Sequence, residues 1–87
     1  MAMRVLIPSA LRSYTGCSIT EADGATLEDV VADLERRFPG IRFRMIDEQG
    51  RIRPHIRFFV SGEAVHDLSR PLEAADEVAI VQALSGG

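Results

Sequence analysis

The 87-residue sequence contains no lysine and no tryptophan, and it has only one cysteine, Cys17. A lone cysteine cannot form an internal disulfide, so the fold has to rest on its apolar core. All ten basic residues are arginines, so the chain has no side-chain amine on which lysine-linked chains of itself could be built. The sequence also lacks an apolar run long enough to cross a membrane and a charged, apolar leader. These absences predict a cytoplasmic protein that does not insert into a membrane.

The length is that of one domain, which would bury on the order of 60–65% of the surface that the unfolded chain exposes. We expect this domain to span residues 1–83, followed by a flexible C-terminal tail over residues 84–87, and to be a monomer when free. Cys17, His55 and His66 lack the spacing of metal ligands. We therefore expect no metal and no other bound cofactor.

Residues 42–57 are rich in arginine, although the net charge of the chain is −3 at pH 7. Single-stranded nucleic acid would need such a basic patch, with stacking from Phe43 or Phe58. However, Asp47 and Glu48 interrupt the patch. We interpret the segment as a solvated face and predict that the protein does not bind nucleic acid.

Short stretches in which apolar residues recur with a period of two predict β-strands. The first stretch, residues 3–7, ends at Pro8, and after a loop over residues 9–16 a second strand over residues 17–21 pairs with it as a loose hairpin. Three further strands are expected in the second half of the chain, over residues 56–60, 63–65 and 77–83.

Residues 26–38 have the spacing of an amphipathic helix. Thr26 followed by Asp29 resembles a capping box with the shorter acid, and Pro39-Gly40 ends the pattern. The apolar residues recur at intervals of three and four, which places them on one helical face. They are Leu27, Val30, Val31, Leu34 and Phe38.

The order of these elements predicts an α+β fold, most simply a β-grasp, in which one main helix covers one face of a mixed sheet of four to five strands. After the helix, Glu48-Gln49-Gly50 reads as a turn. The apolar residues that precede this turn are expected to pack beneath the helix; they are Ile41, Phe43, Met45 and Ile46.

The sequence ends Leu84-Ser85-Gly86-Gly87, directly after the last predicted strand. Two glycines can lie extended in a slot that is too narrow for any side chain. The α-carboxylate is an anion at neutral pH, so it can attack an activated phosphate. Extended from Ala83, the tail reaches at most about 17 Å, enough to enter a partner enzyme. The alternative is that the terminal glycines are a frayed end.

The ending Asp76-Glu77-Val78-Ala79-Ile80-Val81, followed shortly by the two glycines, resembles the C-terminus of the ThiS/MoaD family of β-grasp sulfur carriers. The likeness extends over nearly the whole chain and is greatest to the CysO-like branch. Further matching segments are Val5 to Ile7, Thr26-Leu27, Asp33-Leu34-Glu35, Pro39-Gly40, Val60-Ser61-Gly62-Glu63, and, for that branch, Ile7-Pro8, Leu11-Arg12, Thr15-Gly16 and Arg44 to Gly50.

This resemblance implies that the chain is a carrier and co-substrate, not an enzyme. An E1-like enzyme would use ATP to adenylate Gly87, and a persulfide or sulfide would then give a thiocarboxylate. The residues Leu84, Ser85 and Gly86 would enter the partner with it. The thiocarboxylate would donate its sulfur to a synthase of the cysteine, molybdopterin or thiazole type. The alternatives are a ubiquitin-like modifier, or a molybdopterin-synthase small subunit whose tail docks in a partner.

The chain departs from the family pattern at two places. Ala75 stands where the family commonly has glycine before the acidic pair of the last turn, and alanine would cost about 1 kcal/mol there if the backbone needed a positive φ. Gln82-Ala83-Leu84 stands where the family tends to have proline, which predicts a less stiff tail.

Two groups of residues are predicted to bind partners. Leu6, Phe59 and Val81 fall on the strand phase opposite the residues expected under the helix, so they would form an exposed apolar patch. The alternative is that the loop over residues 41–55 covers them. Asp76 and Glu77 either contact the activating enzyme or belong to a solvated turn.

Overall fold

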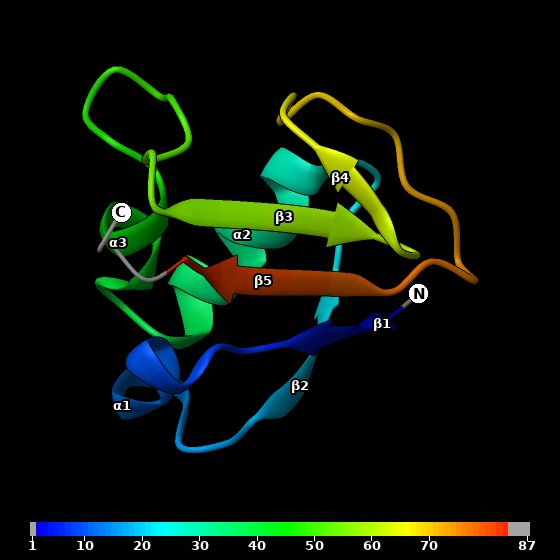
Figure 1. Ribbon diagram of the computed structural model, residues 1–87. Helices are drawn as coiled ribbons and strands as arrows, with labels where there is room; N and C mark the ends of the chain where they lie inside the picture. Colours follow the sequence, from blue (N-terminus) through cyan, green and yellow to red (C-terminus); the bar gives the residue numbers. More distant parts are fainter. Residues whose placement is uncertain (1, 84–87) are drawn as a thin grey trace.

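The computed structural model describes residues 2–83 (Figure 1). It contains one five-stranded sheet with the strand order β2-β1-β5-β3-β4. Strands β1 and β5 pair in parallel and the other neighbours are antiparallel. The strands are β1 (Ala2–Leu6), β2 (Ile19–Asp23), β3 (Ile56–Val60), β4 (Glu63–Val65) and β5 (Val78–Gln82).

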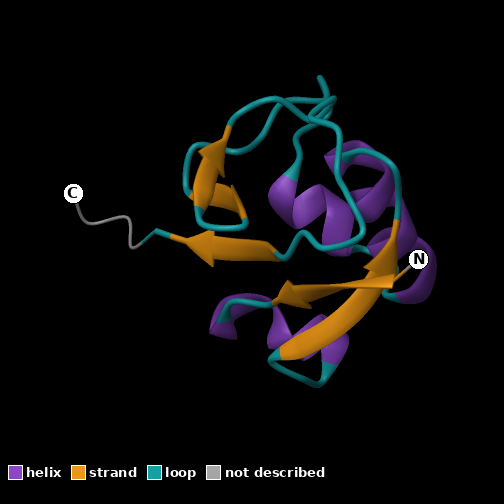
Figure 2. Cartoon of the chain, turned by 90° about the vertical axis from the view of Figure 1, so that its right-hand side faces the viewer, coloured by secondary structure: helices purple, strands orange, loops and turns teal. Residues whose placement is uncertain are grey.

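The longest helix, α2 (Leu27–Arg37), lies behind the sheet in Figure 1. Turned by 90°, the molecule shows the sheet on one side and α2 on the other (Figure 2). A mixed sheet that holds one helix against one face is the β-grasp arrangement, and the predicted fold class is confirmed. The predicted tail, residues 84–87, lies outside the described residues.

Hydrogen bonds at the N-terminus of α2 explain why the helix begins at Leu27. The Thr26 hydroxyl accepts a hydrogen bond from the Asp29 backbone N–H at 3.2 Å. The Asp29 carboxylate accepts one from the Ala25 N–H at 3.3 Å, one residue earlier than in a standard capping box. A Cβ on Gly24 would lie 2.7 Å from the Val30 backbone nitrogen, so this close approach requires glycine.

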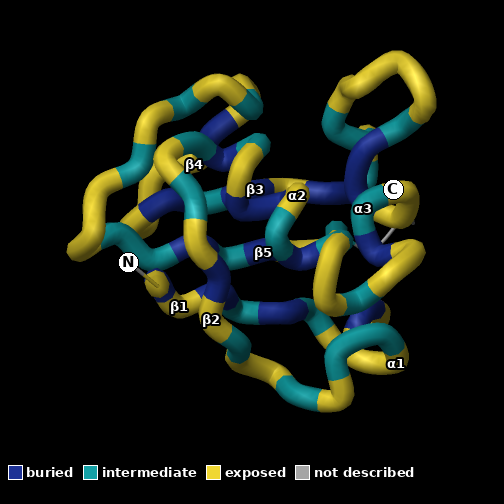
Figure 3. The backbone as a smooth tube through the Cα atoms, turned by 180° about the vertical axis from the view of Figure 1, so that it is seen from behind, coloured by how far each residue is buried: buried dark blue, intermediate teal, exposed yellow. Residues whose placement is uncertain are grey.

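The core lies between α2 and the inner face of the sheet. The helix contributes its predicted apolar stripe, except that Phe38 is only partly buried at its C-terminal end. Figure 3, seen from behind, shows that buried residues alternate with exposed ones along the strands. The strand residues with at most 3% exposure include Val5, Phe58, Val60, Val78 and Ile80, and Ile7, directly after β1, is 2% exposed.

The segment predicted as a loop over residues 9–16 is helical, so that prediction was wrong. It forms a 3-10 turn, η1 (Ser9–Leu11), and a short helix, α1 (Arg12–Thr15). Leu11 is 1% exposed, and the partly buried Tyr14 also packs against the core. Two apolar residues in so short a segment do not establish a periodicity, which is why the sequence pattern did not indicate a helix.

The segment after α2 forms a third helix, α3 (Ile41–Met45), whose buried residues are Ile41 and Met45. Positions i and i+4 share one helical face, so residue 43 points elsewhere. Phe43 is indeed 58% exposed, and the prediction that it packs beneath the helix was wrong. The guanidinium carbon of Arg53 instead lies 4.5 Å from the centre of its ring.

The hairpin β3–β4 turns through two residues with positive φ, Ser61 at 49° and Gly62 at 87°. Two such residues suit the right-handed twist of paired strands. The predicted turn is confirmed. Among residues 2–83, Ser61 is the only non-glycine residue with positive φ. Ala75 therefore carries no left-handed strain, and the departure from the family pattern there has no backbone cost of that kind.

Candidate functional site

The structure fixes the place where the chain leaves the sheet. Strand β5 lies between β1 and β3 and ends at Gln82. The next residue, Ala83, donates its backbone N–H to the His55 carbonyl at 2.7 Å. The predicted functional tail, which comprises Leu84, Ser85, Gly86 and Gly87, follows directly and lies outside the described residues. The site is therefore built from the surfaces around the end of β5.

The outer face of the sheet carries a continuous apolar row. Strand register places Leu6 beside Ala79, and Ala79 beside Phe59. The row extends to the edge strands, because Leu6 pairs with Ile19 and Phe59 pairs with Ala64. It thus crosses all five strands in the order Ile19, Leu6, Ala79, Phe59 and Ala64.

The predicted patch of Leu6, Phe59 and Val81 does lie on the face away from α2. Leu6 and Phe59 are half-buried, and Val81 is 42% exposed. The sequence pattern did not indicate that Ile19, which is 44% exposed, and Ala79 belong to this face. The period of two gave the face on which each residue lies, but the register that aligns the strands was not available from it.

A shallow hollow of about 460 Å³ lies along one side of this row. Strand β5 forms one wall with Ala79 and Val81, and the start of β2 contributes Ile19. Leu6 and Pro8 also line it. An apolar hollow that runs to the end of β5 provides a surface for a partner's apolar side chains next to the point where the tail begins.

The acidic pair Asp76 and Glu77 has internal partners. The Asp76 carboxylate accepts hydrogen bonds from the Glu73 backbone N–H and the Ser61 hydroxyl, both at 2.8 Å. These two donors, the Glu73 N–H first, hold the pKa of Asp76 below its usual range. Asp76 thereby ties the β3–β4 turn to the loop before β5.

Glu77 contributes to the same connection through its backbone. Its N–H donates to the Ser61 hydroxyl at 3.3 Å, and its carbonyl accepts from the Ser61 N–H at 2.8 Å. Its carboxylate lies 3.6 Å from Arg4 Nε and is 46% exposed. These contacts give the pair a structural role, and its predicted contact with an activating enzyme stays a prediction.

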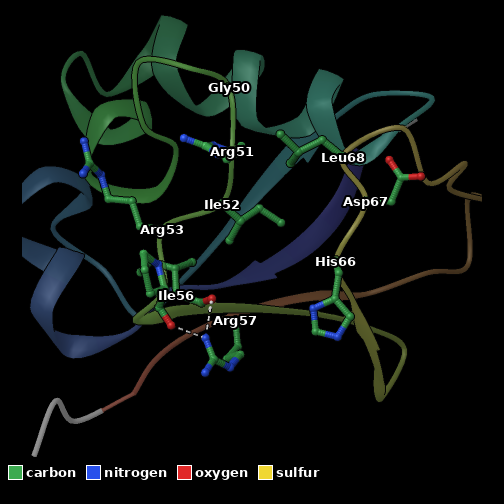
Figure 4. Close-up of a pocket in the computed structure, with 10 residues that line it drawn as sticks. Gly50, Arg51, Ile52, Arg53, Ile56, Arg57, His66, Asp67 and Leu68 are labelled. Atoms are coloured by element: carbon green, nitrogen blue, oxygen red, sulfur yellow. Dashed lines mark hydrogen bonds between the residues drawn. The ribbon is translucent and has the colours of Figure 1, made fainter.

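A second hollow, of about 470 Å³, lies between residues 50–57 and the segment after β4 (Figure 4). Arg51, Arg57, His66 and Asp67 are among the polar residues that line it. The Asp67 carboxylate accepts two hydrogen bonds from Ser69, which lower the pKa of Asp67. This hollow therefore does not contain a carboxyl group whose pKa is raised for proton transfer.

Among residues 2–83, no group of three or more histidine, cysteine, aspartate or glutamate side chains is placed to hold a metal ion. Within the same residues, none of the helices is both long and apolar enough to cross a membrane.

The sequence matches one family profile and several named proteins. The profile of the ThiS family matches residues 5–87. The sulfur carrier protein CysO of Mycobacterium bovis is 33% identical over 93 aligned positions, which cover 100% of both chains. The small archaeal modifier protein 3 of Haloferax volcanii is 34% identical over 68 positions, covering 75% of this chain and 73% of that protein.

The fold comparison agrees with the sequence comparison. A chain in the crystal structure of the Amycolatopsis orientalis BexX/CysO complex superposes with a TM-score of 0.90 and 33% identity, covering 99% of this chain and 100% of that chain. The sheet order, the helix that crosses it and this superposition define a β-grasp protein. The chain belongs to the ThiS family, and the predicted family is confirmed.

Proposed function

We propose that this protein is a sulfur carrier whose chemistry takes place on the C-terminal carboxylate of Gly87. The observation that supports this most strongly is the match to the ThiS family over residues 5–87, which includes the terminal Gly-Gly. The full-length similarity to a protein named as a sulfur carrier adds to it. The chain then acts as carrier and co-substrate, while the catalytic groups belong to partner enzymes.

The proposed cycle has two chemical steps. A carboxylate oxygen of Gly87 attacks the α-phosphorus of ATP on an E1-like enzyme, and pyrophosphate leaves. Hydrosulfide then attacks the acyl carbon and expels AMP, which leaves a thiocarboxylate. If the donor is a persulfide, the first product is an acyl disulfide, and a second thiol must cleave its S–S bond. Because the first step uses ATP, we place the protein in the cytoplasm.

The described surfaces supply the recognition in this cycle. The apolar row, which includes Leu6 and Phe59, would hold the partner against the outer face of the sheet together with the nearby Val81. Strand β5 would then direct the tail into the partner's channel. Among the three acceptor types, cysteine synthesis is favoured because the relatives that match over the full length are named CysO.

The adenylation step is tested by ATP–pyrophosphate exchange with a cognate E1-like enzyme. We expect exchange that saturates with the carrier concentration and that disappears when the carrier is truncated after Ala83. The truncated chain is a matched control because it keeps all described elements of the fold. Equal exchange with and without the last four residues would contradict the proposed function.

A second candidate function is conjugation to other proteins. It is favoured by the 34% identity to a small archaeal modifier protein. Without lysine, this chain could be joined to a lysine of another protein but could not form lysine-linked chains of itself. After activation in the presence of lysine-containing proteins, a modifier would give amide-linked products, whereas a carrier would remain free with sulfur on its terminus.

A further inference from the structure

The ten arginines of the chain divide into two groups by their partners. Six have a carboxylate oxygen within 4.0 Å: Arg4, Arg36, Arg37, Arg42, Arg51 and Arg70. The other four have no such carboxylate among residues 2–83. These are Arg12, Arg44, Arg53 and Arg57.

These four arginines lie around the end of β5. Arg44 and Arg53 line a hollow of about 250 Å³ together with His55 and Gln82. Arg12 lines the apolar hollow together with Gln82. On the other side of β5, Arg57 pairs with Val81 in the strand register. Strand β5 therefore ends inside a basic rim, which we define as Arg12, Arg44, Arg53 and Arg57.

Backbone carbonyls orient three of these side chains. Arg53 donates from Nε to the Phe43 carbonyl at 2.7 Å, and Arg12 donates from Nε to the Ile7 carbonyl at 3.1 Å. Arg57 donates to the carbonyls of Pro54 and Ile56. These bonds hold the guanidinium groups in place and leave further N–H donors available. A guanidinium offers paired donors that match the two oxygens of a carboxylate.

We propose that the basic rim binds an acidic surface around the tail-binding channel of the adenylating enzyme. This inference rests on the proposed function, because the channel belongs to that enzyme. The net charge of −3 would make the carrier as a whole repel an acidic protein. The rim reverses the local sign at the place that must face the channel, so it would steer the tail into the channel entrance.

The test compares charge reversals in the pyrophosphate-exchange assay. Arg44→Glu and Arg57→Glu should each raise the KM for the carrier about tenfold and leave kcat unchanged, because they weaken docking and do not touch the reacting carboxylate. The wild-type KM should rise with salt, and the double variant should respond less.

Arg36→Glu is the matched control. It makes the same change in net charge, but its side chain is 72% exposed and lines a hollow with Ala2 and Asp23. This hollow lies where β1 begins, and because β1 and β5 are parallel, it is away from the end of β5. Its KM should stay near that of the wild type. Circular dichroism should show that all variants are folded.

Two results would contradict the proposal. The first is a wild-type KM in both rim variants, and loss of single-stranded DNA binding in those same variants would then assign the rim to nucleic acid. The second is an equal rise of the KM in Arg36→Glu, since that would be an effect of net charge alone. If the wild-type carrier supports pyrophosphate exchange, either result leaves the proposed function intact. If the wild-type carrier supports no exchange, both the proposed function and the role of the basic rim are contradicted.

Discussion

Gly86→Ala and Gly87→Ala are each expected to reduce adenylation by at least about a hundredfold, as misplacement of a reacting group by about 1 Å can do. The added methyl group would have to fit a channel that is proposed to admit only backbone. The same two changes should leave the fold intact, because the core is built from residues between Met3 and Ile80. The measurement is the initial rate of pyrophosphate exchange, with circular dichroism as the check on folding.

Ser85→Ala is the control for this experiment. Position 85 already carries a Cβ, so alanine there adds no bulk and exchange should stay within a few-fold of the wild-type rate. If both glycine variants instead exchanged pyrophosphate at the wild-type rate, the argument from a narrow channel would be wrong.

Phe58→Ser and Phe59→Ser are expected to have opposite consequences although they are adjacent. Phe58 is 1% exposed beneath α2, and truncating a buried phenylalanine costs about 3–5 kcal/mol. Because small domains are stable by about 5–15 kcal/mol, this change should unfold much of the protein or lower its melting temperature strongly. Thermal unfolding monitored by circular dichroism gives the result.

Phe59 is the aromatic residue of the apolar row and lies between Ala79 and Ala64. Phe59→Ser should weaken binding to the activating enzyme by about 2 kcal/mol or more, as loss of a central aromatic side chain often does. Its cost to stability should be much smaller than that of Phe58→Ser, because the ring is only half-buried. Titration calorimetry with the partner enzyme measures the affinity. If Phe59→Ser unfolds the domain and Phe58→Ser only weakens binding, the assignment of one face of the sheet to the core and the other to the partner is wrong.

Much of the fold could be predicted because periodicity is a local property. The alternation over residues 56–60 identified a strand that the structure has at the same bounds, Ile56–Val60. The spacing of Leu27, Val30, Val31 and Leu34 gave both the helix and its buried face. The same alternation placed Phe58 on the face under α2 and Phe59 on the opposite face of the sheet. Each of these predictions needs only the direction of a side chain along one element.

The features that were missed depend on contacts between distant segments. Ile19 belongs to the apolar row only because β2 pairs with β1 in one register. Asp76 reads as an exposed acid in the sequence, but the Ser61 hydroxyl, fifteen residues earlier, donates a hydrogen bond to one of its carboxylate oxygens. Residues 42–57 read as a solvated face in the sequence. Sequence alone could not show that Arg44, Arg53 and Arg57, which have no carboxylate within 4.0 Å among residues 2–83, lie around the end of β5.

The most direct test of the sulfur-carrier function is the intact mass of the protein after reaction. The protein is incubated with ATP, its E1-like enzyme and sulfide, and is then measured beside a sample without ATP. We predict a gain in mass that corresponds to the replacement of one oxygen by one sulfur, located on the peptide that ends at Gly87 and absent in the Gly87→Ala variant. An unchanged mass after reaction with an enzyme that adenylates the carrier would contradict the central claim that this chain carries sulfur.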